Sequence, residues 1–439
     1  MAGTHSRADG ALLAVHDLRA EPGLLADAVA RPAAGTGTEL ETVRGIIADV
    51  RARGDAALVE LTRRFDGADV SAPGALRAHP DELVEAWKGL DPVLCDSLET
   101  AVRRVRAYHD TPAAAHRYED EGIAVSERAV PVERAGIYVP GGRADYPSTV
   151  LMTVIPAQAA GVRSIAVCVP PRRDGTLPPT VAAAAHLLGV PEVYKVGGAQ
   201  AIAALAYGTA TIAAVDVVVG PGNAYVALAK SEVARDVGVE SLAGPSECVV
   251  VADAGAPVAA VAADLMAQAE HGPGGFTMLV TWSDDLAAAV VDALAAMVEA
   301  SPRAEQILST FGDGGRLVLC RDAAHAIEVA NAAAAEHLQL MVADPSALVP
   351  LVRSAGAVFC GYDTPVALGD YLAGPSHVLP TAGTARFASA LRPADFVKSV
   401  HVVTASHDGL GRLGPVAATL ARAEGLEAHA LSIDVRLDR

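Results

Sequence analysis

The sequence predicts an α/β protein built on two doubly wound parallel sheets, with small extension domains at the N- and C-termini. From Val130 onward, short apolar strands alternate with Ala-rich helices, a pattern typical of parallel sheets covered by helices on both faces. The alternation runs first to Val219 and again from Cys248 to Cys360, without a sequence-level repeat. A chain of 439 residues is also too long for one ordinary core, so two or three domains are expected.

The first part of the chain lacks this alternation. Residues 1–35 are loosely patterned and are assigned to an N-terminal extension. Apolar residues then recur at steps of three and four, which predicts helices over 39–54, 55–65 and 91–109. We expect this helical segment, residues 36–135, to pack on the second α/β unit.

Three glycine-containing turns follow strands of the first α/β unit, residues 136–245. The unit's expected strands cover 137–139, 164–169, 193–196 and 215–219, and its helices cover 147–161, about 180–188 and a segment from 199. The carboxyl ends of parallel strands line one crevice, and glycines let backbone amides approach a phosphate there. No complete G-x-G-x-x-G is present, so a dinucleotide site and plain strand-to-helix turns both remain open. The turns are Pro140-Gly141-Gly142-Arg143, Gly197-Gly198-Ala199-Gln200 and Gly220-Pro221-Gly222-Asn223.

In the second α/β unit, residues 246–385, an apolar helix over 258–270 ends in Gln268-Ala269-Glu270-His271-Gly272-Pro273. Gln268 and His271 stand three apart at the last turn, so their side chains should leave the same face. An amide oxygen beside an imidazole nitrogen is half of a mixed N/O metal site, which another His and a carboxylate would complete. A lone pair of this kind is more commonly structural.

Further clusters of acids and histidines lie downstream. Glu336-His337 sits between an expected helix and an expected strand, where it is either a general-base pair or a solvated Glu beside a structural His. Asp370 and His377 lie in a Gly- and Pro-rich loop, which is typical of functional loops. The tail, residues 386–439, has one expected strand (400–404) and one expected helix (413–423), followed by Glu424 and His429, and is too small for a core of its own.

Composition narrows the class of protein. Lys and Arg total 34 against 52 Asp and Glu, a net charge of −18 without a basic stripe, which argues against nucleic acid as a partner. The five cysteines are scattered without C-x-x-C spacing, which predicts free thiols in a reducing compartment. The first residues lack the apolar core of a signal peptide, and the uncharged stretch 196–215 is too rich in Gly and polar residues to span a membrane. A cytoplasmic protein is expected.

Taken in order, these segments resemble the histidinol dehydrogenase family over nearly the whole chain. The resemblance implies incomplete Rossmann-like domains and a zinc-dependent, NAD-linked oxidation of L-histidinol to L-histidine through bound histidinal, by two hydride transfers. The motifs that carry it are GIYVPGG, PSTVLM, GGAQAIAALAYGT, GPGNAYVALAK, AGPSE, QAEHGP, AEHL, GDYLAG with HVLPT, and EGLEAH.

The resemblance also implies roles for individual residues. His337 would be the base in both oxidations, and Glu336 would activate the water that hydrates the aldehyde. One zinc ion per subunit would be bound by Gln268, His271, Asp370 and His429. The substrate-binding set would be Ser246, His377 and Glu424 together with His337 and the four zinc ligands, and the NAD contacts would be Tyr138, Gln200 and Asn223.

In this family the C-terminal segment packs on the partner subunit. The resemblance therefore implies a homodimer in which Glu424 and His429 complete the other protomer's site. Residues 136–245 would bind NAD, and residues 246–385 would carry the zinc and catalytic residues.

The chain departs from the family pattern at a few positions, none of them a proposed metal ligand or catalytic residue. Three alternatives stay open: a paralogue that oxidises another small polar alcohol, such as sulfopropanediol or another amino alcohol, a zinc hydrolase, and a binding protein without activity. The altered positions are Ser376 after Pro375 where Asn is common, Gln339 where Glu is usual, Ala390 in a Ser-Gly-Leu, and Glu240-Ser241 where an Asp is frequent.

Overall fold

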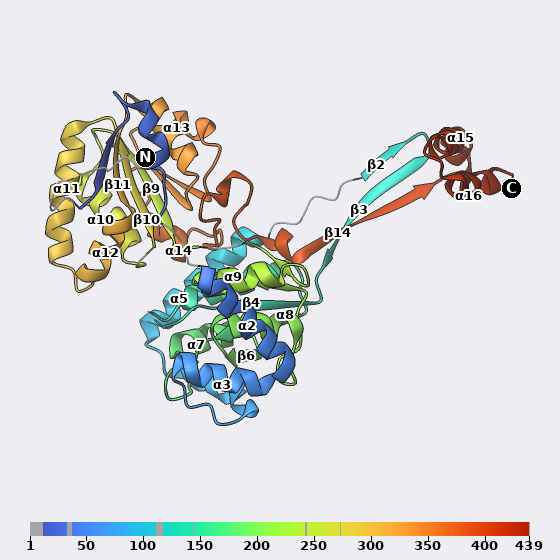
Figure 1. Cartoon of the computed structure of the whole chain (residues 1–439), viewed down its shortest axis with the longest axis horizontal. Coiled ribbons are helices and arrows are strands. Elements are labelled where there is room, and N and C mark those ends of the chain that lie inside the picture. Colours follow the sequence, from blue (N-terminus) through green and yellow to red (C-terminus); the bar gives the residue numbers. More distant parts are fainter. Residues whose placement is uncertain are drawn as a thin grey trace. The chain divides into compact units, whose positions relative to one another are not determined.

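The computed structural model describes residues 12–32, 37–110, 117–142, 144–241, 244–272 and 274–438. Arg143, Ala243 and Pro273, which belong to three of the motifs above, and residues 1–11 and 33–35 of the N-terminal extension lie outside the described residues. The chain forms two compact units (Figure 1). Unit 1 comprises Met1–Asp110 and Glu133–Asp395, and unit 2 comprises Thr111–Val132 and Phe396–Arg439.

Unit 1 contains two parallel sheets whose strands follow the same order apart from the additional edge strand β1 of the second, which confirms the predicted pair of Rossmann-like units. The first strand of each run lies inside its sheet, and the order reverses between β4 and β7 and between β9 and β12. The first sheet has the order β6-β5-β4-β7-β8, with β4 (Arg134–Tyr138), β5 (Ser164–Val169), β6 (Glu192–Lys195), β7 (Val217–Val219) and β8 (Gly238–Val239). The second has the order β1-β11-β10-β9-β12-β13, with β1 (Ala14–Asp17), β9 (Glu247–Ala252), β10 (Phe276–Thr281), β11 (Gly315–Leu319), β12 (His337–Met341) and β13 (Ala357–Cys360).

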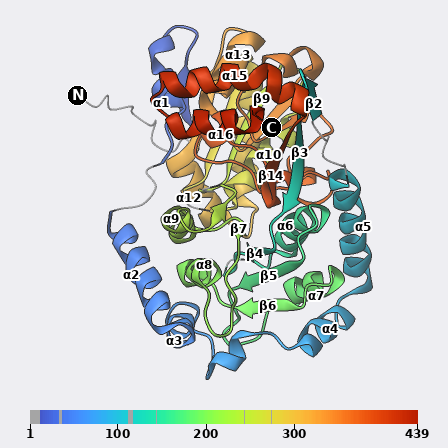
Figure 2. The same cartoon turned by 90° about the vertical axis from the view of Figure 1, so that its right-hand side faces the viewer.

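The N-terminal helical segment packs on the first sheet, and the expectation that it packs on the second unit is wrong. Val43 and Leu58 share one buried core with Ile202 and Leu205 of the first unit, because both helices present an apolar stripe to α8. Figure 2 shows α2 and α3 along one side of this sheet and α4 and α5 along the other. The helices are α2 (Gly37–Arg53), α3 (Asp55–Asp66), α4 (Pro80–Lys88), α5 (Pro92–His109), α6 (Pro147–Ala159), α7 (Pro179–Leu187), α8 (Gly198–Tyr207) and α9 (Ala224–Val233).

The second sheet is covered on both faces. Val250 of β9 belongs to the core on one face and its neighbour Val251 to the core on the other, as alternation along a strand requires. The N-terminal segment is part of this structure, because β1 pairs with β11 and Leu18 is buried in the second of these cores. The helices around this sheet are α1 (Leu25–Ala28), α10 (Val258–Ala269), α11 (Asp284–Glu299), α12 (Ala304–Gly314), α13 (Ala323–Ala333) and α14 (Ala367–Tyr371).

Unit 2 is a narrow antiparallel sheet followed by a helical hairpin. The sheet has the order β14-β3-β2, with β2 (Arg117–Asp120), β3 (Ile123–Pro131) and β14 (Val397–Ala405), and the hairpin is α15 (His407–Ala423) and α16 (Glu427–Leu437). The strand and the first helix expected in the tail are both present, whereas β3 and α16 were not predicted. Several large apolar side chains of the unit are exposed, with Val403 at 66%, Leu420 at 63% and Leu431 at 60%.

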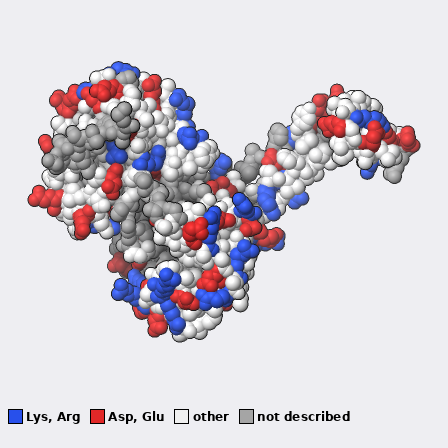
Figure 3. Space-filling view, in the orientation of Figure 1, with Lys and Arg blue, Asp and Glu red and all other residues white. Residues whose placement is uncertain are grey.

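The face of the molecule drawn in Figure 3 carries Lys and Arg interspersed with Asp and Glu. All five cysteines carry free thiols, as expected. Among the described residues, no helix is both long enough and apolar enough to cross a lipid bilayer.

Candidate active site at the amino edge of the second sheet

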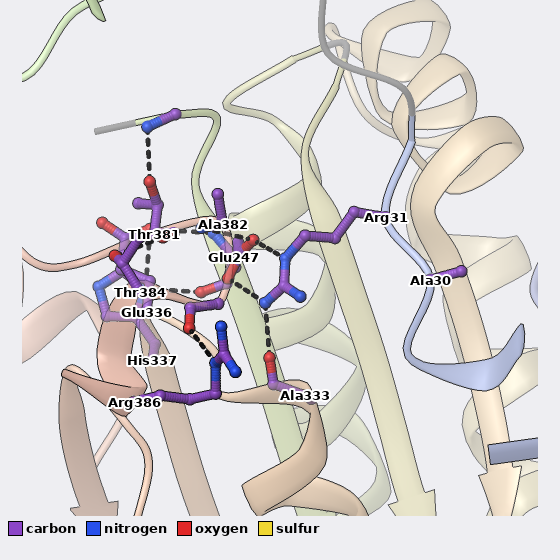
Figure 4. Close-up of polar contacts among 12 residues, drawn as sticks. Ala30, Arg31, Glu247, Ala333, Glu336, His337, Thr381, Ala382, Thr384 and Arg386 are labelled. Atoms are coloured by element: carbon purple, nitrogen blue, oxygen red, sulfur yellow. Dashed lines mark hydrogen bonds and ion pairs between the residues drawn. The ribbon is translucent and has the colours of Figure 1, made fainter. Parts of the chain in front are cut away.

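The Glu336-His337 pair stands at the amino end of β12, and both side chains are buried. The residue that holds them is Glu247, which begins the neighbouring strand β9 (Figure 4). Its N–H donates to Oε2 of Glu336 at 2.9 Å, and its carbonyl oxygen accepts from Nδ1 of His337, also at 2.9 Å. A carbonyl can only accept, so the proton of the neutral ring sits on Nδ1 and the lone pair on Nε2. This is the tautomer that a general base at Nε2 requires.

Burial shifts the pKa of both members of the pair. It raises the pKa of Glu336 to about 8, against the opposing effect of the Glu247 N–H bond. It lowers the pKa of His337 below 6.5, against the opposing effect of the Asp370 carboxylate. At neutral pH, His337 is therefore ready to accept a proton. Shifts of this kind in two adjacent buried groups are typical of catalytic sites.

Gln268 and His271 flank the end of α10. Gln268 is buried in the last turn, where its Nε2 finds no hydrogen-bond partner within the described part of the chain. His271 lies beyond the helix, which ends at Ala269, so the expectation that it belongs to the last turn is wrong. Its Nδ1 is 3.2 Å from the carbonyl oxygen of Ala267 and 3.3 Å from that of Gln268, contacts in which the ring nitrogen donates.

Asp370 and His377 come from α14 and the loop after it. Nδ1 of His377 donates to the carbonyl oxygen of Asp370 at 3.1 Å, and Nε2 lies 3.4 Å from Oγ1 of Thr149 on α6. Ser376 beside it donates from its hydroxyl to the carbonyl oxygen of Met152 at 2.8 Å. The loop therefore connects the second sheet to a helix of the first.

Electrostatic effects show that the separate clusters share one environment. Burial is the largest influence on the pKa values of Glu336, His337 and His377, but Asp370 raises all three. The His271 ring opposes it, lowering the pKa of Glu336 and of His377. Four segments that are distant in sequence thus converge at the amino edge of the second sheet.

Ser246 and two of the altered family positions, Gln339 and Ser376, belong to the segments that form this site. Ser246, which is half-buried, directly precedes Glu247, and its carbonyl oxygen accepts from Phe276 N–H at 3.2 Å. Gln339 of β12 is buried and donates from Nε2 to Oδ2 of Asp264 at 2.6 Å. Gln339 and Ser376 therefore both have bonding partners within the protein.

The residues expected to contact NAD lie at the opposite, carboxyl edge of the first sheet. Tyr138 ends β4, and its hydroxyl accepts from Gly198 N–H at 3.1 Å. Gln200 is buried in α8, with its Nε2 unpaired among the residues that the structure covers. Asn223 is exposed and caps α9, with Oδ1 accepting from Val226 N–H at 3.2 Å.

The turns at this edge are shaped by glycine. Gly220 follows β7 with φ of 124°, and a Cβ built there would lie 2.0 Å from the carbonyl oxygen of Tyr138. Cβ atoms at Gly141 and Gly197 would both meet the ring of Pro170, at 3.2 and 2.7 Å. Glycine therefore lets these turns pack closely beside the N-termini of α8 and α9, which is the location where α/β sheets bind a dinucleotide diphosphate.

The donor set expected for zinc is divided between the two units. Gln268, His271 and Asp370 belong to unit 1, whereas His429 belongs to unit 2, where it is exposed and lines a groove on α15 and α16. Across the described ranges, no three His, Cys, Asp or Glu side chains are grouped to hold a metal ion. The buried, unpaired amide of Gln268 fits a metal ligand, since amide oxygen and nitrogen exchange places by a flip. Amide, imidazole and carboxylate donors together suit zinc.

Sequence analysis missed several residues of this site. Thr149 could have been proposed from the sequence, because it belongs to the PSTVLM motif. Glu247 belongs to AGPSE, but nothing in the motif indicates that its backbone would hold two other side chains. Arg31, whose guanidinium contacts the Glu247 carboxylate, has no sequence signal at all.

Known proteins resemble this chain along nearly its full length. A sequence model of the histidinol dehydrogenase family matches residues 29–437. Histidinol dehydrogenase of Gluconobacter oxydans is 46% identical over 401 residues, covering 91% of this chain and 93% of that protein. The Thermosynechococcus vestitus enzyme is 45% identical over 424 residues, with coverage of 96% and 97%.

A solved structure agrees with these sequences. The crystal structure of histidinol dehydrogenase from Elizabethkingia anophelis superimposes with a TM-score of 0.93 at 32% identity, covering 98% of each chain. Family match, identity and fold agree along the whole molecule. The chain therefore belongs to the histidinol dehydrogenase family and is an NAD-dependent oxidoreductase of that type.

Proposed function

We propose that this enzyme oxidises L-histidinol to L-histidine in two successive steps, with the intermediate aldehyde histidinal kept bound. The proposal rests mainly on the buried Glu336-His337 pair. Both side chains are hydrogen-bonded to the backbone of Glu247. Asp370 and His271 lie near enough to influence the pKa of Glu336. The alcohol loses two electrons and two protons to become the aldehyde. Addition of water, followed by loss of two more electrons and three protons, then gives the carboxylate.

His337 is the base in both oxidations. Its Nε2 accepts the hydroxyl proton as hydride leaves the same carbon, first from the alcohol and then from the hydrated aldehyde. Burial supports this role, because a lowered pKa keeps the ring neutral at physiological pH. The bond from Nδ1 to the Glu247 carbonyl holds the tautomer and orientation of the ring.

Glu336 prepares the second oxidation. As a carboxylate it takes a proton from the water that adds to the aldehyde carbon. With a pKa of about 8, the free enzyme holds this group mostly protonated at pH 7. The nearby His271 ring favours ionisation, and a bound cation would favour it further.

Gln268, His271, Asp370 and His429 would hold one zinc ion. Zinc bound there would supply a Lewis acid that orients the substrate. Ser246, His377 and Glu424 contribute further contacts to the substrate. The unpaired amide of Gln268 supports this ligand set.

NAD would be contacted by Tyr138, Gln200 and Asn223. Its binding domain would be residues 136–245, and residues 246–385 would carry the zinc and the catalytic residues. Bound NAD supplies the acceptor for each hydride. The unpaired Nε2 of Gln200 supports the proposal, as do the glycine turns around Gly220. The five free thiols support a reducing, cytoplasmic location.

A homodimer would complete each site, with Glu424 and His429 supplied by the partner subunit. The exposed apolar side chains of unit 2, such as Leu420 and Leu431, support such a contact because they lack cover within their own unit. The other parts of the chain would then be an N-terminal segment (1–35), a helical segment (36–135) and a dimer-forming segment (386–439).

The test is a steady-state assay that follows NADH with L-histidinol and a panel of polar alcohols, including sulfopropanediol. We expect the highest kcat/KM with L-histidinol. Activity should be lost when the metal is removed by a chelator and should return when zinc is added. The variant His337→Asn should lower kcat by about 10³-fold, the scale of a lost general base. A better substrate elsewhere in the panel would establish the paralogue, and hydrolysis without NADH formation would establish a zinc hydrolase.

A further inference from the structure

Arg31, in the N-terminal segment, reaches the residue that holds the catalytic pair. Its Nε and Nη2 contact the two carboxylate oxygens of Glu247, with Nη2 at 2.9 Å from Oε2 (Figure 4). Nη2 also donates to the carbonyl oxygen of Ala333, at the end of α13, at 2.6 Å. The guanidinium carbon lies 5.4 Å from the centroid of the Phe276 ring. Arg31 is thus fixed by contacts with two strands and a helix of the second sheet.

The side chain of Glu247 fixes the position of the residue, and its backbone N–H and carbonyl oxygen bond to the two proposed catalytic groups. The side chain is only 3% exposed, and its Oε1 also accepts from Ala382 N–H at 3.0 Å. Its own N–H and carbonyl bond to Glu336 and His337. One peptide segment therefore sets the position of both groups that the chemistry uses.

We propose that Arg31 and Glu247 are a positioning pair, by which the N-terminal segment fixes the orientation of Glu336 and His337. This inference rests on the proposed function, in which those two groups carry the chemistry. It also gives the N-terminal extension a role that its sequence did not suggest.

Glu247 is the first residue of β9, and its own N–H and carbonyl oxygen are directed to Glu336 and His337. A buried carboxylate needs a partner, and a bidentate Arg fixes its direction as well as its charge. Without Arg31, Ala382 N–H would remain as a partner of this buried carboxylate, and loss of the bidentate contact would let the Glu247 peptide shift. A displacement of about 1 Å at a catalytic group can slow a reaction about 100-fold.

The experiment compares Arg31→Ala, Arg31→Lys and Glu247→Gln with the exposed control Arg386→Ala, whose Nε donates to the carbonyl oxygen of Gly383 at 3.2 Å. We expect Arg31→Ala and Glu247→Gln each to lower kcat about 100-fold with little change in the KM for NAD. Arg31→Lys keeps the charge and is expected to fold, but should lose about tenfold because an ammonium cannot bind both oxygens in a fixed plane. The control should match the wild type.

Two further readouts separate positioning from a general loss of structure. The double variant Arg31→Ala/Glu247→Gln should be no slower than the slower single variant, because both remove one contact. Millimolar guanidinium should restore part of the kcat of Arg31→Ala without raising its Tm. A kcat within twofold of wild type in Arg31→Lys and Arg31→Ala would overturn the inference, as would losses confined to KM and Tm.

The variant His337→Asn, measured in parallel, separates a failure of the proposed function from a failure of the positioning role. If it retains wild-type turnover, the proposed function fails and the positioning role fails with it. If it loses turnover while the Arg31 variants do not, the inference alone fails.

Discussion

A single carbonyl group determines what His337 can do. The bond from Nδ1 to Glu247 O leaves Nε2 as the basic nitrogen, and burial keeps the ring neutral. The sequence identified Glu336 and His337 as adjacent candidates but could not separate a base from a structural His. That distinction depends on Glu247, 90 positions away from His337, and no local pattern encodes such a contact.

Activity should therefore fall on the acid side at a pH below the ordinary histidine value. Because the folded-state pKa of His337 lies below 6.5, the ring remains neutral above it and is protonated as pH falls through it. The kcat/KM for alcohol oxidation, which reports ionisations of the free enzyme, should have its acid midpoint below 6.5 when measured against pH. A midpoint above 7 would contradict the burial argument.

The two oxidations should respond differently to Glu336→Gln. The first step needs only His337 and should proceed, whereas the second should slow by about 100-fold because the water lacks a base. In the wild type, the second step should speed up as rising pH removes the proton from Glu336, with a midpoint below about 8 because a bound cation favours ionisation. Rapid-quench measurements with an aldehyde trap would show histidinal accumulating in the variant. Equal slowing of both steps would assign Glu336 a different role.

At the scale of elements, the sequence predicted most strands and helices of unit 1 but not their arrangement. Strand β5 (Ser164–Val169) was predicted with its observed bounds, because continuous apolar runs between turns are a local signal. That β9 lies between β10 and β12, which brings Glu247 beside His337, is a long-range property. The proposed catalytic pair lies at the amino edge of its sheet, whereas the expected NAD turns lie at the carboxyl edge of the other sheet. Open α/β sheets generally bind ligands at the carboxyl ends of their strands, and this rule predicts the NAD turns but not the position of Glu336 and His337.

The turn after β7 should not tolerate a side chain. At Gly220, Ala would adopt an unfavourable φ and place its Cβ 2.0 Å from the Tyr138 carbonyl oxygen. We expect Gly220→Ala to destabilise the protein by about 2–4 kcal/mol and to raise the KM for NAD. Gly45→Ala, at an exposed position in α2 with open space around it, should stabilise by about 0.5–1 kcal/mol. Denaturant unfolding of both variants checks this, and equal stability would contradict the steric argument.

At the scale of the whole molecule, the tail was recognised as unable to form its own core, and its exposed Val403 and Leu420 agree with that. The pairing of β14 with β3 was not predictable, because these strands are far apart in the sequence and neither has a fully buried residue, so neither carries a strong apolar pattern. Which chain supplies His429 is likewise a question of assembly, which a single sequence does not encode.

Mixing two inactive variants tests the shared site. If His429 acts in the partner's site, a heterodimer of His337→Asn and His429→Ala has one site with both residues intact. Random exchange of subunits should then restore about a quarter of wild-type activity, since half of the dimers are mixed and half of their sites are complete. Each variant exchanged with itself is the control. If mixing restores nothing although subunits exchange, His429 acts within its own chain.

The most direct test of the central claim is the ratio of NADH formed to L-histidinol consumed by the wild-type enzyme, measured to completion with product identification. Two oxidations at one site predict two NADH and one L-histidine for each L-histidinol, with no free aldehyde captured by a trap. One NADH for each L-histidinol, with histidinal released into solution, would contradict the account.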